Sequence, residues 1–210
     1  TPKGKGSLVM EETTMQQVKH LSEQHDATTK VTFGFWVYLM TDCILFATLF
    51  ATFAVLHNNT FGGPGGKELF SLPFVLIETL LLLTSSFTCG LAMLAAHRQR
   101  RELVLVSLGI TFLLGIAFLG FELTEFRHLA LEGNSWRRSG FLSAFFTLVG
   151  THGLHIATGL LWSVVLAVRI NSHGLTHSSV RQLTMFSLFW HFLALVWLIL
   201  FRIVYLLGAA

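Results

Sequence analysis

Charged residues are scarce in this sequence: Asp, Glu, Lys and Arg make up only 12% of its 210 residues, whereas 53% are hydrophobic. A water-soluble protein of this length carries more charge on its surface, so the composition excludes that class and favours a membrane protein. The formal net charge of +3 is spread over short connections. We therefore expect no basic surface for nucleic acid.

Cysteine is also nearly absent. The two cysteines, Cys43 and Cys89, both lie inside apolar runs. Thiols in such runs are usually small buried side chains, so neither a disulfide framework nor a cysteine metal site is indicated.

Long uncharged runs dominate the chain, and they predict an all-α, polytopic membrane protein with a five-transmembrane-helix bundle. Helices are predicted at about residues 31–56, 72–97, 102–128, 139–169 and 181–207, within one transmembrane domain over residues 31–210. A transmembrane barrel would show short alternating segments instead. Residues 1–30 are predicted to be a polar N-terminal tail, in which only Met10–Leu21 suggests a short helix.

Basic residues in the connections predict the orientation. Nine of them would lie on the side of the N-terminus and four on the other side. Because basic loops stay in the cytoplasm, the N-terminus is predicted to be cytoplasmic.

The fourth apolar run, Gly140–Val168, contains 29 residues without a charge. His152 and His155 are three residues apart in its centre and thus share a helix face. Gly150 and Gly153 would let another backbone approach closely. We expect this helix to pack against other protein rather than lipid.

Two carboxylates lie inside predicted spans. Asp42 is about 17 Å along the first helix and Glu78 about 9 Å along the second, at 1.5 Å per residue. A charge at the bilayer centre costs at least ~2.5 kcal/mol, so each acid needs a partner, a water molecule or a proton. A proton-linked or subunit-contact role and a protonated acid bonded to a neighbouring helix both stay open for Glu78, while the second is favoured for Asp42.

Further polar residues flank the end of the third helix. Glu122, Glu125 and His128 follow at steps of three, along one side of the helix. The spacing of Glu125 and His128 matches the Glu-x-x-His element of di-iron bundles, but the second copy that such sites require is absent from the sequence. We predict an interhelical polar seam with His152 and His155, with no metal and no catalytic residue.

The fifth helix carries Trp190, His191 and Trp197, which are expected to fix packing rather than bind a cofactor. A haem held by His191 together with His152 or His155 is not forbidden by depth, but no sequence feature requires it.

Five segments resemble subunit III of the haem–copper terminal oxidases and follow one another in that family's order. They are FGFWVYLMTDCILFATLFATFAV, GGPGGKELFSLPFVLIET, FELTEFRHL, RSGFLSAFFTLVGTHGLHIATGLLW and SLFWHFLALVW. Within the family, the five helices and the GGPGGKELFSLPF loop resemble the bacterial cytochrome bo-type ubiquinol oxidase form.

The resemblance implies a subunit without cofactors of its own, in a proton-pumping ubiquinol oxidase complex of the bacterial inner membrane. Haem and copper, and with them quinol oxidation and oxygen reduction, would belong to subunit I. Subunit I would be the main contact, with subunits II and IV as further partners. The family's subunit III holds membrane lipids in a cleft between helix groups, stabilises the catalytic subunit and supports proton uptake.

Individual positions are implied in the same way. The family's buried helix carboxylate falls on Glu78, its acid and histidine seam on Glu122, Glu125, His128, His152 and His155, and its last-helix histidine on His191. Ala194 departs from the family, which often has an acid there. A polar contact of the last helix is thus absent or made differently.

Two other functions are weighed against this one. A proton-coupled transporter using Asp42 and Glu78 would show broken helices or an internal repeat, and neither is evident in the sequence. An intramembrane haem or metal enzyme would need the histidines as ligands. The accessory oxidase subunit is the favoured interpretation.

Overall fold

The computed structural model describes residues 3–56, 72–131 and 140–206, and throughout these ranges the structure is helical apart from two short turns. The helices are α1 (Lys3–Leu56), α3 (Leu72–His97), α4 (Arg101–Leu131), α5 (Gly140–His173) and α6 (His177–Leu200), followed by the π-helical segment η1 (Phe201–Leu206). Five of the described helical segments are long and apolar enough to cross a membrane. The predicted all-α, five-span architecture is confirmed.

The chain divides into two compact units, Thr1–Cys43 and Ile44–Ala210. The first unit differs from the prediction, because α1 is helical from Lys3, where a polar tail was expected. Neither Gly nor Pro occurs between Ser7 and Phe33. Adding residues to an existing helix is far easier than nucleating one, so the span beginning near Thr29 extends backwards through this polar sequence.

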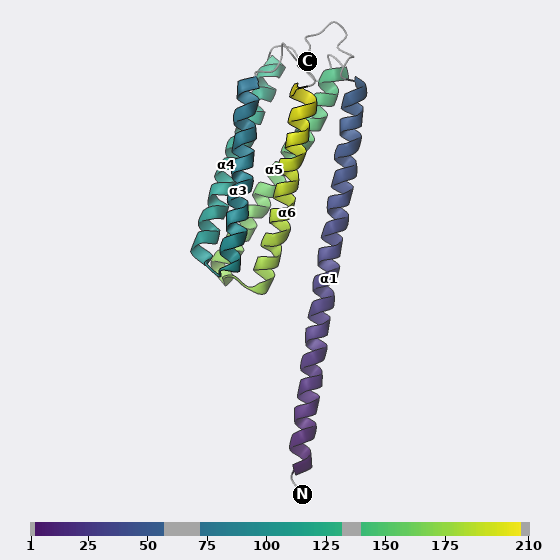
Figure 1. Ribbon diagram of the computed structural model, residues 1–210, viewed down its shortest axis with the longest axis vertical. Coiled ribbons are helices and arrows are strands. Elements are labelled where there is room, and N and C mark those ends of the chain that lie inside the picture. The colour runs from purple at the N-terminus through teal and green to yellow at the C-terminus, as the bar shows by residue number, and fades with distance from the viewer. Residues whose placement is uncertain (1–2, 57–71, 132–139, 207–210) are drawn as a thin grey trace. The chain divides into compact units, whose positions relative to one another are not determined.

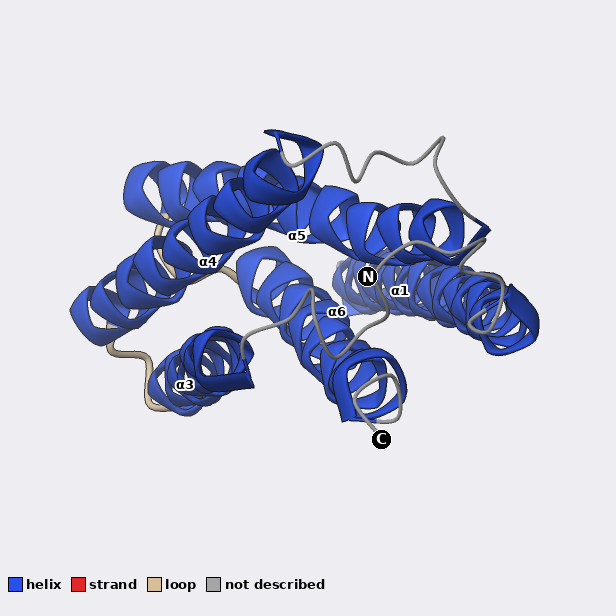
Figure 2. Ribbon diagram, turned by 90° about the horizontal axis from the view of Figure 1, so that it is seen from above, coloured by secondary structure: helices blue, strands red, loops and turns tan. Residues whose placement is uncertain are grey.

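Within the second unit, α3, α4, α5 and α6 form a closed arrangement in which each helix packs on the next and α6 returns to α3 (Figures 1 and 2). The turns after α3 and after α5 lie at the same end of this bundle (Figure 1). Gln99 and Gly174 reverse the chain there with positive φ angles of 56° and 73°. At the same end, Arg101 donates hydrogen bonds to the carbonyl and side-chain oxygens of Asn171, which joins α4 to α5.

Apart from the start of α1, the helix ends agree with the sequence prediction to within a few residues. Helix α3 has the predicted bounds, while α4 and α5 continue to Leu131 and His173. Helix α6 begins at His177, earlier than predicted, because the Oγ1 atom of Thr176 accepts a hydrogen bond from the backbone N–H of Ser179 and caps it. The connections at residues 57–71 and 132–139 lie outside the described residues.

Candidate interhelical polar site

Glu122 is the most enclosed acid of α4, with only 2% of its surface exposed. Its carboxylate lies against Gly153 of α5: an added Cβ at Gly153 would be 2.8 Å from Oε1 and 2.9 Å from Oε2. Neither oxygen has a hydrogen-bond partner among the residues that the structure describes. Burying a carboxyl group without a hydrogen bond is costly, so Glu122 is a candidate for function rather than for stability.

Glu78 of α3 is fully buried as well, and its two carboxylate oxygens likewise lack a hydrogen-bond partner within the described part of the chain. It lies within electrostatic range of Glu122 and of the half-buried Glu125. The structure thus brings together an acid of α3 and two acids of α4, although Glu78 and Glu122 are 44 positions apart in the sequence. We call Glu78, Glu122 and Glu125 the acidic cluster.

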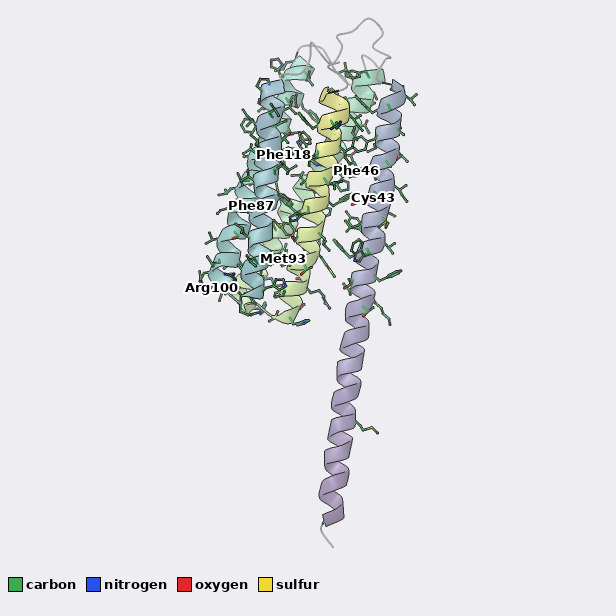
Figure 3. All side chains as sticks on the ribbon, viewed as in Figure 1. Cys43, Phe46, Phe87, Met93, Arg100 and Phe118 are labelled. Atoms are coloured by element: carbon green, nitrogen blue, oxygen red, sulfur yellow. The ribbon has the colours of Figure 1, made fainter. Side chains whose placement is uncertain are left out.

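His152 is completely buried on α5, and it connects α5 to α6. Its Nε2 atom lies 3.1 Å from the backbone oxygen of Leu193. Because a carbonyl oxygen only accepts, Nε2 carries the proton and donates. The rings of Phe118 and Phe46, marked in Figure 3, flank the imidazole with centroid distances of 5.9 and 6.4 Å. The resolved hydrogen bond of His152 therefore goes to a backbone group of α6.

The remaining histidines of the predicted seam differ in burial and in their hydrogen bonds. His155 is half-buried, and its Nδ1 donates to the carbonyl of Thr151 at 2.7 Å. His128 is exposed in the last turn of α4. His191 is exposed on α6, and its Nδ1 donates to the carbonyl of Ser187 at 2.7 Å. Asp42 belongs to the first unit, where the side chain of Tyr38, one turn earlier, hydrogen-bonds it.

Comparison with known proteins identifies the family. The family model described as "Cytochrome c oxidase subunit III" matches residues 8–209. This chain belongs to the cytochrome c oxidase subunit III family. The resemblance seen in the sequence is thereby confirmed.

Individual relatives are quinol oxidase subunits by name. The chain is 56% identical over 185 residues to "Cytochrome bo(3) ubiquinol oxidase subunit 3" of Pseudomonas aeruginosa, an alignment that covers 88% of each chain. It is 44% identical over 180 residues to the protein of the same name in Buchnera aphidicola, covering 86% of this chain and 93% of the relative. It is 45% identical over 175 residues to "Quinol oxidase subunit 3" of Bacillus spizizenii, covering 83% and 86%.

Two tryptophans of α6 hold the bundle of this subunit III family member together. Trp197 donates from Nε1 to the hydroxyl of Thr79 at 3.1 Å, and its ring meets that of Phe118 edge-on at 4.7 Å. Seven residues earlier, Trp190 donates from Nε1 to the hydroxyl of Ser85 at 3.0 Å. Each indole thus joins α6 to α3 while its ring fills the interior, in agreement with the packing role expected from the sequence.

Glycines make room for Trp190. An added Cβ would be 3.0 Å from its ring at Gly115 and 2.8 Å at Gly159. Gly159 lies seven positions after His152 and so shares its face of α5, as helical spacing indicates, whereas Gly115 and the hydroxyl acceptors Thr79 and Ser85 were missed. A lone glycine or hydroxyl inside an apolar run gives no signal of the helix that it faces.

The described side chains offer no group of three or more His, Cys, Asp or Glu placed to hold a metal ion. In the acidic cluster, the side chains of Glu78 and Glu122 are buried, and the Nε2 of His152 donates to the Leu193 carbonyl. This arrangement can hold and release protons or stabilise helix contacts.

Proposed function

We propose that this chain is the accessory subunit III of a proton-pumping haem–copper ubiquinol oxidase in the bacterial inner membrane. The observation that carries the proposal is the 56% identity, over 88% of both chains, to a protein named as subunit 3 of cytochrome bo(3) ubiquinol oxidase. Relatives with quinol oxidase names from distant bacteria support it.

In this proposal the electron chemistry belongs to a partner. Haem and copper are held by subunit I, which oxidises ubiquinol and reduces oxygen. The present chain packs mainly against subunit I, also contacts subunits II and IV, and carries no cofactor. Its unbroken spanning helices and long apolar outer faces suit a chain that is embedded among other subunits and lipids.

The acidic cluster is the part of the chain that we assign to proton uptake. Glu78 and Glu122 are buried in a span and lack hydrogen bonds to the described residues, so changing their protonation would break no protein hydrogen bond among those residues. Acids inside a membrane are expensive and are usually kept for proton transfer or for a partner. We assign the cluster a supporting role in keeping subunit I supplied with protons, beside lipids held in a cleft of this subunit.

The orientation proposed from the sequence places the N-terminus in the cytoplasm. It is supported by arginines at the bundle end that carries the α3–α4 and α5–α6 turns (Figure 1). Arg98, Arg100, Arg101, Arg169 and Arg181 all lie in or beside these turns. Loops rich in basic residues remain cytoplasmic, so this end of the bundle would face the cytoplasm.

The test is purification through a tag on this chain in mild detergent, with an absorption spectrum before and after its partners are stripped. We expect haem bands to arrive with a large partner and to leave with it, together with quinol oxidase activity. Haem retained on the isolated 23.4 kDa chain, or purification without any haem-bearing partner, would refute the proposal.

A further inference from the structure

Helix α6 has an outward face that its own bundle leaves uncovered. Along it, Leu188, His191, Leu195 and Ile199 are exposed at helical spacing, and Arg202 is exposed in the η1 segment that continues α6. The opposite face is buried and carries the two bundle tryptophans. We call these five residues the α6 outer stripe.

His191 is the polar residue in the middle of this stripe. The membrane-spanning segment His177–Val204 has 14 residues before it and 13 after it, so the imidazole lies at mid-depth. Its Nδ1 donates to the Ser187 carbonyl of its own helix at 2.7 Å. In the neutral ring Nε2 is then an acceptor, and no described residue donates to it.

The neighbouring helix leaves space at this nitrogen. Gly90 of α3 has no side chain, and the nearest atom to an added Cβ there would be His191 Nε2, at 4.0 Å. On the same face of α3, Leu83, Phe87 and Leu94 are exposed, one or two turns from Gly90. An apolar ridge with a notch at Gly90 therefore runs along α3 beside the α6 outer stripe.

We propose that this notch, with His191 Nε2 above Gly90, receives a transmembrane helix of another chain, which donates a side-chain hydrogen bond to Nε2. The inference rests on the proposed function, since it takes the partner from the same oxidase complex. It deepens that function by naming a contact residue and the chemistry of the group that meets it.

Lipid cannot satisfy this acceptor. Acyl chains have no hydrogen-bond donors, headgroups lie far from mid-depth, and water is rare there. A Ser, Thr, Asn or Trp side chain on a packed helix supplies the donor, as is usual between membrane helices. The small residue at Gly90 permits the close approach that such a bond needs.

Charge at the end of the stripe offers the partner helix a second contact. Arg202 lies 11 residues beyond His191, on the same exposed face. At helical rise that is roughly 16 Å, which reaches the outer membrane interface. The partner helix that fits has a donor at mid-depth and an acidic residue about three turns further out.

The partner can be captured in the intact complex with a photo-crosslinking amino acid in place of Leu195, one turn from His191. The matched control places it at Leu161, which is 68% exposed on α5 and outside the stripe. We expect Leu195 to crosslink to another chain, at a peptide with a donor side chain within one turn, and Leu161 not to reach that peptide. Adducts with lipid alone, with a second copy of this chain, or with a peptide lacking a donor would overturn the proposal.

Substitution of His191 tests the hydrogen bond itself. His191→Leu should lower retention of the crosslinked partner roughly three- to tenfold, the range for an interhelical hydrogen bond in membranes. His191→Gln, whose side-chain oxygen can accept a hydrogen bond, should retain more of the partner than His191→Leu does. If wild type brings down the oxidase and all three forms retain the partner equally, the inference fails while the proposed function stands. If wild type brings down no haem-bearing partner, the proposed function itself fails.

Discussion

The Cα of Gly153 on α5 lies so close to the carboxylate of Glu122 on α4 that a methyl group there would come within 2.8 Å of Oε1. Two helices can approach this closely at a buried acid only where the facing residue on the other helix is a glycine, which has no side chain. The closeness of α4 and α5 at Glu122 depends on this pair.

Gly153→Ala should therefore destabilise the bundle by about 1–3 kcal/mol, because the new methyl group forces Glu122 or the α5 backbone to move. Gly109→Ala is the matched control, since nothing described lies within 4 Å of a Cβ there. Alanine favours a helix over glycine, so the control should be neutral or stabilising. The measurement is the midpoint of detergent-induced unfolding of the purified complex, and equal behaviour of the two variants would contradict the steric account.

Shortening the acid should relieve the clash. In the double variant Glu122→Ala/Gly153→Ala the loss should be smaller than the sum of the two single losses, by at least ~0.5 kcal/mol. Simple additivity in the same unfolding measurement would mean that the two side chains do not meet.

Trp190→Phe should cost about 1–3 kcal/mol, since it removes the hydrogen bond to Ser85 and leaves a void over Gly115 and Gly159. Trp36→Phe serves as control, because Trp36 is 47% exposed and belongs to the first unit. The stability of both variants is measured as the loss of intact complex on heating. A Trp190 variant as heat-resistant as the Trp36 variant would show that the indole does not hold α3, α4 and α5 to α6.

His152→Leu should destabilise by about 1–2 kcal/mol through loss of the hydrogen bond to the Leu193 carbonyl. His152→Gln keeps an N–H donor and should lose less. His173→Ala, at an exposed position in the last turn of α5, should change stability by less than ~0.5 kcal/mol. The measurement is the fraction of intact complex that remains after heating. The loss should be smallest for His173→Ala, larger for His152→Gln and largest for His152→Leu, and any other order would count against this hydrogen bond.

Glu78→Gln tests the acidic cluster under turnover. The substitution preserves shape and, among the described residues, breaks no hydrogen bond to the carboxylate oxygens, so recovery of the complex should stay near wild type. Removing the titratable group should shorten the time over which the working oxidase stays active. Glu102→Gln is the control, at an exposed position in the first turn of α4. Active lifetimes of the Glu78 and Glu102 variants that match wild type would remove Glu78 from any role in proton uptake.

Most of the secondary structure could be predicted from the sequence, and the N-terminal segment could not. The spans were recognisable because each contains more uncharged residues than a bilayer requires, and helical hydrogen bonds are local. Residues before Val31 have no apolar periodicity, so their helix follows from continuity with the span rather than from a pattern of their own. The start of α6 was missed by four residues because the Thr176 cap lies in a polar stretch with several possible starting points.

The sequence by itself determined that this is an all-α membrane protein of the subunit III family. It also drew attention to the acids and histidines in the spans, since polar residues in an apolar run are visible without a structure. Only the tertiary structure decided which of them meet. It placed Glu122 against Gly153, gave the proton of His152 to the carbonyl of Leu193, and turned His191 outward. The physical reason is that the rotation of each helix and its depth relative to its neighbours depend on packing. A backbone carbonyl that accepts a hydrogen bond, or a glycine that leaves room for a side chain, looks the same at every position of a sequence, so the sequence does not show which one is used.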